Sequence, residues 1–184
     1  MYELRMHGRG GQGAVMGAQI LAKALLNEDK YAVTIPAFGF ERRGAPVVAY
    51  LKFDDSPIRQ HTNVRFPNIV MCIDPTLPNS VPIFDGAQSD ATAILCTTQS
   101  LDAFDFGSQI TKVGLCDGIG IAMSTIGRSI TNTIMLGAFV KVTGLVSLES
   151  LNSAMGEMAF RDAALEKNII AVKQGFDQTK VYEL

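Results

Sequence analysis

The sequence predicts a single α/β domain over residues 1–184, built as a three-layer, Rossmann-like sandwich around a mostly parallel sheet. Short apolar strands alternate with segments whose apolar residues recur at helical spacing, and a glycine cluster separates the first strand from the first helix. The 184 residues, of which 47% are hydrophobic and 18% charged, suit one hydrophobic core. Right-handed crossovers are expected to place helices on both faces of the sheet.

The first third of the chain predicts three strands and one helix. Tyr2 to His7 alternates in character as a strand does, and helical spacing of apolar residues begins at Ala14, directly after the glycine cluster. Runs rich in β-branched and aromatic residues predict a second strand at Tyr31 to Phe38 and a third at Ala45 to Phe53. The charged loop Gly39 to Gly44 joins them.

Three more short strands are predicted in the middle of the chain. They are the apolar runs Asn68 to Ile73, Ala91 to Cys96 and Ile110 to Cys116. Asp74 follows the first of these runs and Asp117 follows the last. We expect each aspartate to cap the start of a helix, because carboxylates accept hydrogen bonds from free N–H groups there, and the proline after Asp74 suits a first helical position.

The last third of the chain predicts helices. Apolar residues share one helical face between Ile134 and Val142, and Gly144 offers the left-handed conformation that ends many helices. Ser147 is expected to cap the next helix, and another helix follows it. Their apolar faces, in which methionines are interpreted as core residues, comprise Leu148, Leu151, Met155 and Met158, then Leu165, Ile169, Val172 and Phe176.

Charge and hydropathy exclude several classes of partner. The formal net charge of −2 gives no basic field for nucleic acid or an anionic membrane. No apolar segment reaches the roughly 18 residues of a membrane span, and charged residues in the first ten positions argue against a secretory signal. Cys72, Cys96 and Cys116 lie in apolar surroundings with no close pair among them, as expected of buried, reduced thiols in a cytoplasmic protein without its own iron–sulfur cluster.

The segment Gly8 to Gly13 matches the pattern G-x-G-x-x-G directly after a strand and before a helix. Glycines permit a sharp turn, and free N–H groups at a helix start attract phosphate oxygens, so the pattern favours a phosphate-bearing ligand. The alternative is a tight turn packed against a partner. A dinucleotide site would need an acidic residue to hold the ribose, but the first one after the second strand, Glu41, lies farther along the chain than expected. The following Arg42 and Arg43 favour a ligand with several phosphates or an anionic neighbouring subunit.

Catalytic patterns are missing from the sequence. The glycine loop lacks the lysine and hydroxyl residue of a P-loop, and no Ser/His/Asp or Cys/His set can be assembled. The chain is therefore expected to bind a ligand and not to transform it by itself.

Three segments together resemble one family: HGRGGQG at His7 to Gly13, FGFERRGAPV at Phe38 to Val47 and NTIMLGA at Asn132 to Ala138. They resemble the γ subunit of 2-oxoacid:ferredoxin oxidoreductases of the pyruvate, 2-oxoisovalerate and phenylglyoxylate type. The segments DDSPIR, DPTL and TGLVSLESL extend the likeness over nearly the whole chain.

The resemblance implies a heteromeric enzyme with α, β and δ-type partner subunits. These partners would hold thiamine diphosphate, magnesium and [4Fe–4S] clusters, decarboxylate a 2-oxoacid and pass electrons to ferredoxin or NAD. Coenzyme A would accept the acyl group, and the γ chain would contribute coenzyme A binding without a catalytic or metal-ligating residue of its own. The implied site consists of Arg9, Gly10, Gly11, Gln12, Gly13, Glu41, Arg42, Arg43, Asn132 and Thr133.

Several alternatives remain open from sequence. Pyruvate is the first expectation for the 2-oxoacid, and Phe40, at a position where a small residue is expected, leaves an aryl substrate such as phenylglyoxylate open. A free-standing oxidoreductase that binds NAD or FAD, or an interaction scaffold that binds no small molecule, would also be compatible with the glycine loop.

Overall fold

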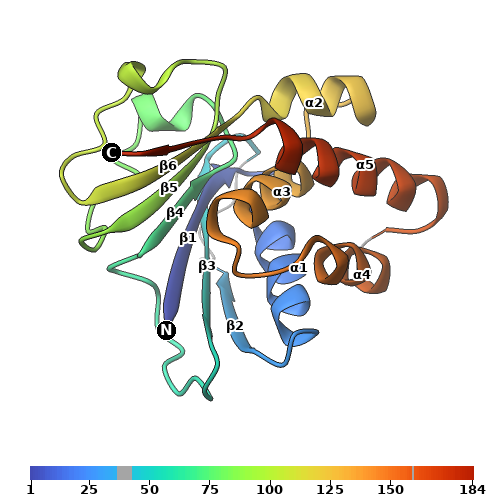
Figure 1. Cartoon of the computed structure of the whole chain (residues 1–184), viewed down its shortest axis with the longest axis horizontal. Coiled ribbons are helices and arrows are strands. Elements are labelled where there is room, and N and C mark those ends of the chain that lie inside the picture. Colours follow the sequence, from blue (N-terminus) through green and yellow to red (C-terminus); the bar gives the residue numbers. More distant parts are fainter. Residues whose placement is uncertain (37–42, 159) are drawn as a thin grey trace.

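The computed structural model describes residues 1–36, 43–158 and 160–184 (Figure 1). These residues form a seven-stranded sheet in the order β2-β3-β1-β4-β5-β6-β7. The strands are β1 (Tyr2–Arg9), β2 (Tyr31–Pro36), β3 (Pro46–Asp54), β4 (Ile69–Cys72), β5 (Ala91–Cys96), β6 (Ile110–Cys116) and β7 (Lys180–Glu183). The helices are α1 (Ala14–Leu26), α2 (Gly118–Thr125), α3 (Asn132–Thr143), α4 (Leu148–Met158) and α5 (Asp162–Gln178), with 3-10 helices η1 (Leu77–Asn79) and η2 (Leu101–Ala103).

The sheet is mixed, and most of its strands share one direction. Strands β1, β4, β5 and β6 pair in parallel. Strand β2 runs the same way, because it pairs antiparallel with β3, which itself pairs antiparallel with β1. Only β3 and β7 oppose the others in the described sheet. The mostly parallel α/β fold is therefore confirmed, whereas the short edge strand β7 was not predicted.

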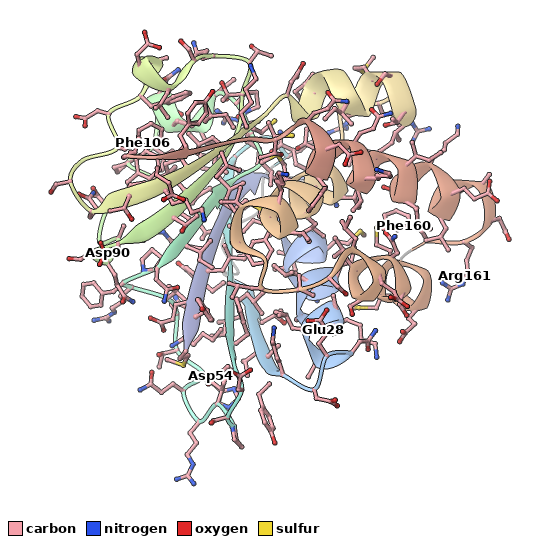
Figure 2. All side chains as sticks on the ribbon, viewed as in Figure 1. Glu28, Asp54, Asp90, Phe106, Phe160 and Arg161 are labelled. Carbon is pink, nitrogen blue, oxygen red and sulfur yellow. The ribbon has the colours of Figure 1, made fainter. Side chains whose placement is uncertain are left out.

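The two faces of the sheet are covered differently. The α-helices lie on one face (Figure 1), where their apolar residues share a core with Leu4 and Met6 of β1. The opposite face carries a second cluster that includes Val70 and Phe106, and Phe106 lies on the side away from the helices (Figure 2). The segments around η1 and η2 cover this second cluster. A third layer is present, but the prediction of helices on both faces is wrong.

The connections after β4 and β5 explain this difference. They contain only short 3-10 turns, and Pro75, Pro78 and Pro82 interrupt the first of them, so no long helix forms there. The prediction that Asp74 caps a helix is accordingly wrong: its Oδ1 accepts a hydrogen bond from the Thr76 N–H at 2.9 Å in a local turn. The same prediction for Asp117 is confirmed, because its Oδ1 accepts from the Gly120 N–H at 2.8 Å at the start of α2.

The helical predictions for the last third are largely confirmed. Gly144 ends α3 with a φ of 64°, and the Ser147 hydroxyl accepts a hydrogen bond from the Ser150 N–H at 3.1 Å. Met155 is fully buried, but Met158 is 48% exposed, so its assignment to the core is wrong.

The three cysteines are free and buried, as predicted. Burial is the main cause that raises the pKa of Cys72 and of Cys96 to about 12, and it also raises the pKa of Cys116. The thiols therefore stay protonated at neutral pH. Protonated thiols inside a packed core do not bind metal or attack a substrate.

His7 in β1 is a buried histidine held in its neutral form. Its side chain is 5% exposed, and Arg5 Nε donates a hydrogen bond to His7 Nε2 at 3.1 Å. Nε2 can accept this bond only if it carries no proton. Burial first, and then the neighbouring Arg5 charge, lowers the pKa of His7 to about 3.

The low pKa of His7 predicts a loss of stability in mild acid. The unfolded chain binds a proton at His7 near pH 6.5, whereas the folded chain does not until about pH 3, so stability is retained above pH 6.5 and falls as the pH drops toward 3. Between pH 7 and pH 5 this histidine should remove about 2 kcal/mol of unfolding free energy. Urea unfolding at both pH values should show a smaller loss in His7→Gln, whose amide oxygen can still accept from Arg5. Equal losses in the two proteins would contradict this account.

Candidate functional site

The glycine loop lies between β1 and α1, as the sequence predicts. Gly11 and Gly13 have φ values of 91° and 81°, a left-handed backbone conformation that residues other than glycine rarely adopt. The chain turns there within a few residues and enters α1 at Ala14. A β-carbon added to Gly13 would lie 2.5 Å from Nδ2 of Asn132 in α3, so it would also displace that side-chain amide.

Some backbone N–H groups of the loop donate hydrogen bonds within the protein, and others are free. The Gly10 N–H donates to the Ala45 carbonyl at 2.9 Å, and the Gln12 N–H donates to the Arg9 carbonyl at 3.0 Å. By contrast, no acceptor among the described residues bonds the N–H groups of Gly11, Gly13 and residues 14–16. Free N–H groups at a helix start can bind an anion.

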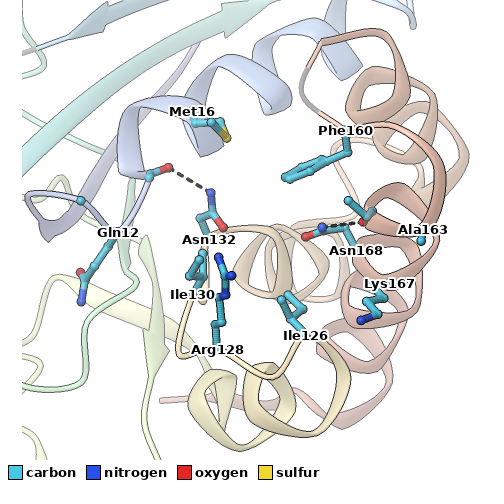
Figure 3. Close-up of a pocket in the computed structure, with 13 residues that line it drawn as sticks. Gln12, Met16, Ile126, Arg128, Ile130, Asn132, Phe160, Ala163, Lys167 and Asn168 are labelled. Carbon is cyan, nitrogen blue, oxygen red and sulfur yellow. Dashed lines mark hydrogen bonds between the residues drawn. The ribbon is translucent and has the colours of Figure 1, made fainter.

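These N–H groups lie at the edge of a pocket of ≈ 510 Å³ (Figure 3). The starts of α1, α3 and α5 surround it, together with the connection between α2 and α3. Phe160 and Arg128 lie on opposite sides of the pocket in this view. The lining residues are Gly11, Gln12, Gly13, Met16, Ile126, Arg128, Ile130, Asn132, Phe160, Ala163, Ala164, Lys167 and Asn168.

The pocket is electropositive along one part and apolar along another. Arg128 and Lys167 have no carboxylate partner in the described part of the chain, and no described acidic residue lines the pocket. The positive ends of three helix dipoles add to these two charges. Met16, Ile126 and Phe160 supply apolar surface. Such a site suits a ligand that carries negative charge at one end and apolar groups elsewhere.

A chain of polar side chains fixes the three helix starts relative to one another. Asn132 Nδ2 donates to the Gly13 carbonyl at 3.3 Å and joins α3 to the glycine loop (Figure 3). Thr133 Oγ1 donates to Asn168 Oδ1 at 2.7 Å, and Asn168 Nδ2 donates to the Ala164 carbonyl at 2.8 Å, which joins α3 to α5. Since these groups are buried and paired, they hold the pocket in shape.

The structure brings part of the predicted site together. Gly11, Gln12, Gly13 and Asn132 line the pocket. The remaining described residues of the predicted set do not line it: Arg9, Gly10, Arg43 and Thr133.

The predicted residues outside the lining have other surroundings. The Arg9 guanidinium donates to the Gly44 carbonyl at 3.1 Å and to Thr76 Oγ1 at 2.8 Å, Thr133 is fully buried, and Arg43 is exposed. The predictions for Phe40, Glu41 and Arg42 concern positions outside the described residues.

Sequence reasoning missed Arg128, Lys167 and Phe160. Arg128 precedes the NTIMLGA segment and belongs to no recognised motif, while Lys167 and Phe160 come from a distant part of the chain. The only local signal was the position of Arg128 just ahead of a predicted helix start that already carried Asn132.

Residues 1–36, 43–158 and 160–184 offer neither a membrane span nor a metal site. No helix there has both the length and the apolar character needed to cross a membrane. No group of three histidine, cysteine or acidic side chains in the same residues is placed to hold a metal ion.

Comparison with known proteins gives a consistent result along the chain. The family model for pyruvate ferredoxin/flavodoxin oxidoreductase matches residues 3–178. The γ subunit of the NADH-dependent phenylglyoxylate dehydrogenase of Aromatoleum evansii is 49% identical over 184 residues, which cover 100% of this chain and 97% of the relative. The common γ subunit of the pyruvate/ketoisovalerate oxidoreductases of Thermococcus kodakarensis is 45% identical over 186 residues, with 100% of both chains covered.

A solved structure extends the comparison to three dimensions. The crystal structure of the pyruvate oxidoreductase subunit PORC of Thermotoga maritima superposes with a TM-score of 0.84 at 34% identity. The superposition covers 99% of this chain and 98% of that chain. The fold is therefore shared over nearly the whole length of both chains.

Proposed function

The chain belongs to the pyruvate ferredoxin/flavodoxin oxidoreductase family as a γ-type subunit, and on that premise we propose that it binds coenzyme A for a cytoplasmic, multi-subunit 2-oxoacid oxidoreductase. The whole enzyme would convert a 2-oxoacid and coenzyme A into acyl-CoA and CO₂. Partner subunits of α, β and δ type would carry out the decarboxylation and the electron transfer to ferredoxin or NAD.

The cofactors of this reaction belong on the partner chains in our proposal. Thiamine diphosphate with magnesium would supply decarboxylation there, and [4Fe–4S] clusters would supply electron transfer. The three cysteines of the present chain are buried and protonated, which is unsuitable for cluster ligation. This leaves the pocket at the glycine loop as the contribution of the γ chain.

One observation carries the assignment to coenzyme A: free N–H groups, two cations without a carboxylate partner among the described residues, and an apolar wall meet in a single pocket. Coenzyme A joins phosphate groups to an adenine ring and a long, weakly polar arm that ends in a thiol. The N–H groups of Gly11 and Gly13, with Arg128 and Lys167, would bind phosphate oxygens. Phe160 and its apolar neighbours would contact the adenine or the arm.

The choice of 2-oxoacid belongs on the partner chains as well. The T. kodakarensis relative is named as a subunit common to pyruvate and ketoisovalerate oxidoreductases, so one γ chain belongs to both enzymes there. We extend that arrangement to this protein. Coenzyme A-dependent reduction of a dye, assayed with pyruvate, a branched-chain 2-oxoacid and phenylglyoxylate, would identify the substrate of the native complex.

Hydrogen exchange in the assembled complex tests the coenzyme A site directly. Coenzyme A without 2-oxoacid is expected to slow exchange saturably in peptides that cover residues 11–16 and 160–168, because it would occupy the free N–H groups and close the pocket. Residues 101–109, on the opposite face of the sheet, serve as the internal control. NAD and NADH should leave the pocket peptides unchanged. Slowing by NADH alone would favour a dinucleotide site, and no slowing by either ligand would favour a scaffold.

A further inference from the structure

A buried carboxylate contacts the glycine loop but does not belong to the ligand site described above. Asp74 follows β4, is 5% exposed and does not line the pocket. Its Oδ2 accepts from Gln12 Nε2 at 2.6 Å, and its Oδ1 lies 3.4 Å from Arg9 Nε. Thr76 donates to Oδ1 through its N–H at 2.9 Å and its hydroxyl at 2.5 Å. Since both oxygens are occupied by the protein itself, Asp74 is neither a ligand for the substrate nor a free base.

The donor and acceptor pattern around Gln12 requires an acceptor at position 74. Gln12 Oε1 accepts from the Arg9 N–H at 2.7 Å, so the other end of the same amide, Nε2, must face an acceptor. Asp74 supplies that acceptor. The amide of Gln12 is thereby used at both ends, and the residue between Gly11 and Gly13 is fixed in place.

Arg9 is held by the same carboxylate and fixes the opposite side of the loop. Its guanidinium also bonds Thr76 Oγ1 and the Gly44 carbonyl, next to the backbone bonds that join Gly10 to Gly44 and Ala45. Burial alone would raise the pKa of Asp74, but the hydrogen bonds from Thr76 and Gln12 outweigh burial and hold the pKa below its usual value. The carboxylate is therefore charged at neutral pH.

We propose that Asp74 is a positioning residue for the anion site: by holding Gln12 and Arg9, it fixes the direction of the free N–H groups of Gly11 and Gly13. This inference rests on the proposed binding of coenzyme A at the glycine loop. It assigns to Asp74 a role in ligand affinity and not in the chemical step.

Asp74→Asn tests this role with almost no change in shape. If the new amide oxygen stays with Thr76, the new NH₂ group faces Gln12 Nε2, so two donors meet and the Gln12 amide must turn away. In the assembled complex we expect the apparent KM for coenzyme A to rise about tenfold while kcat at saturating coenzyme A changes less than twofold. Exchange of amides in residues 8–13 should become about tenfold faster.

The matched control is Asp105→Asn. Asp105 accepts from the Gly107 N–H at 3.0 Å, a local turn of the same kind as that of Asp74 and Thr76, but it lies on the opposite face of the sheet and is exposed. This variant should leave both readouts unchanged.

Arg128→Ala separates the failure of this inference from the failure of the proposed function. An unchanged KM in Asp74→Asn beside a raised KM in Arg128→Ala would overturn the role of Asp74 alone. Unchanged amide exchange in residues 8–13 of Asp74→Asn would do the same. If neither variant changed the KM, the coenzyme A site itself would be refuted, and the inference with it.

Discussion

Gly137→Ala is expected to lower the unfolding free energy of the chain by about 3 kcal/mol or more. Gly137 lies where α3 crosses α5. A β-carbon there would lie 2.0 Å from the Val172 carbonyl oxygen and 2.9 Å from the Phe176 backbone nitrogen. Both neighbours are backbone atoms of a helix, so no side chain can rotate away to make room.

The close contact at this crossing involves a glycine of each helix. A β-carbon on Gly175 of α5 would lie 2.2 Å from the Ile134 carbonyl oxygen of α3. The added methyl group must therefore push α3 and α5 apart. Because α5 carries Lys167 and Asn168 of the pocket, a surviving folded fraction should also bind coenzyme A more weakly.

Urea unfolding of Gly137→Ala should be compared with that of Gly156→Ala. Gly156 is also inside a helix, α4, but its β-carbon would meet only the flexible end of Leu165 at 3.3 Å. This control should stay within about 1 kcal/mol of the wild type, since alanine also favours helix. Equal stabilities of the two variants would show that the α3–α5 crossing can relax.

The parts of the fold that sequence predicted are those set by local patterns. The strand, glycine loop and α1 follow one another within residues 2–26, and each is marked by periodicity or by glycine. The end of α3 at Gly144 and the cap at Ser147 are likewise local. The composition of the third layer was not predictable in this way, because the 3-10 turns and loops that form it have no periodic signal. Strand β7 forms by pairing with the free edge of β6, and that edge exists only in the folded sheet.

The residues of the candidate site likewise fall into two groups: those marked by local sequence patterns and those that only the fold brings together. Gly11, Gly13 and Asn132 belong to segments that could be recognised in the sequence. Arg128 and Lys167 are far apart in the chain, and only the meeting of α5 with the connection before α3 brings them to one pocket. The NTIMLGA segment also has a structural role that the resemblance did not imply. Thr133 donates a hydrogen bond to Asn168 of α5, and Gly137 leaves room for the backbone of α5.

Removing both cations of the pocket is expected to have the largest effect on function. The double variant Arg128→Ala, Lys167→Ala should raise the apparent KM for coenzyme A about a hundredfold, since each charge-assisted contact with phosphate contributes about a factor of ten. The value of kcat at saturating coenzyme A should change far less, because neither side chain is assigned to the chemical step. The KM of the wild type should rise with ionic strength, and that rise should be smaller in the double variant.

The control must remove the same total charge elsewhere on the chain. Lys112 and Lys173 serve this purpose, since they pair with Glu183 and Asp177 outside the pocket. If the double variant Lys112→Ala, Lys173→Ala raised the KM as much, the effect would come from the overall field and not from contacts in the pocket. If the KM rose a hundredfold only in the Arg128→Ala, Lys167→Ala variant, the two cations would act at short range, through contacts with bound phosphate.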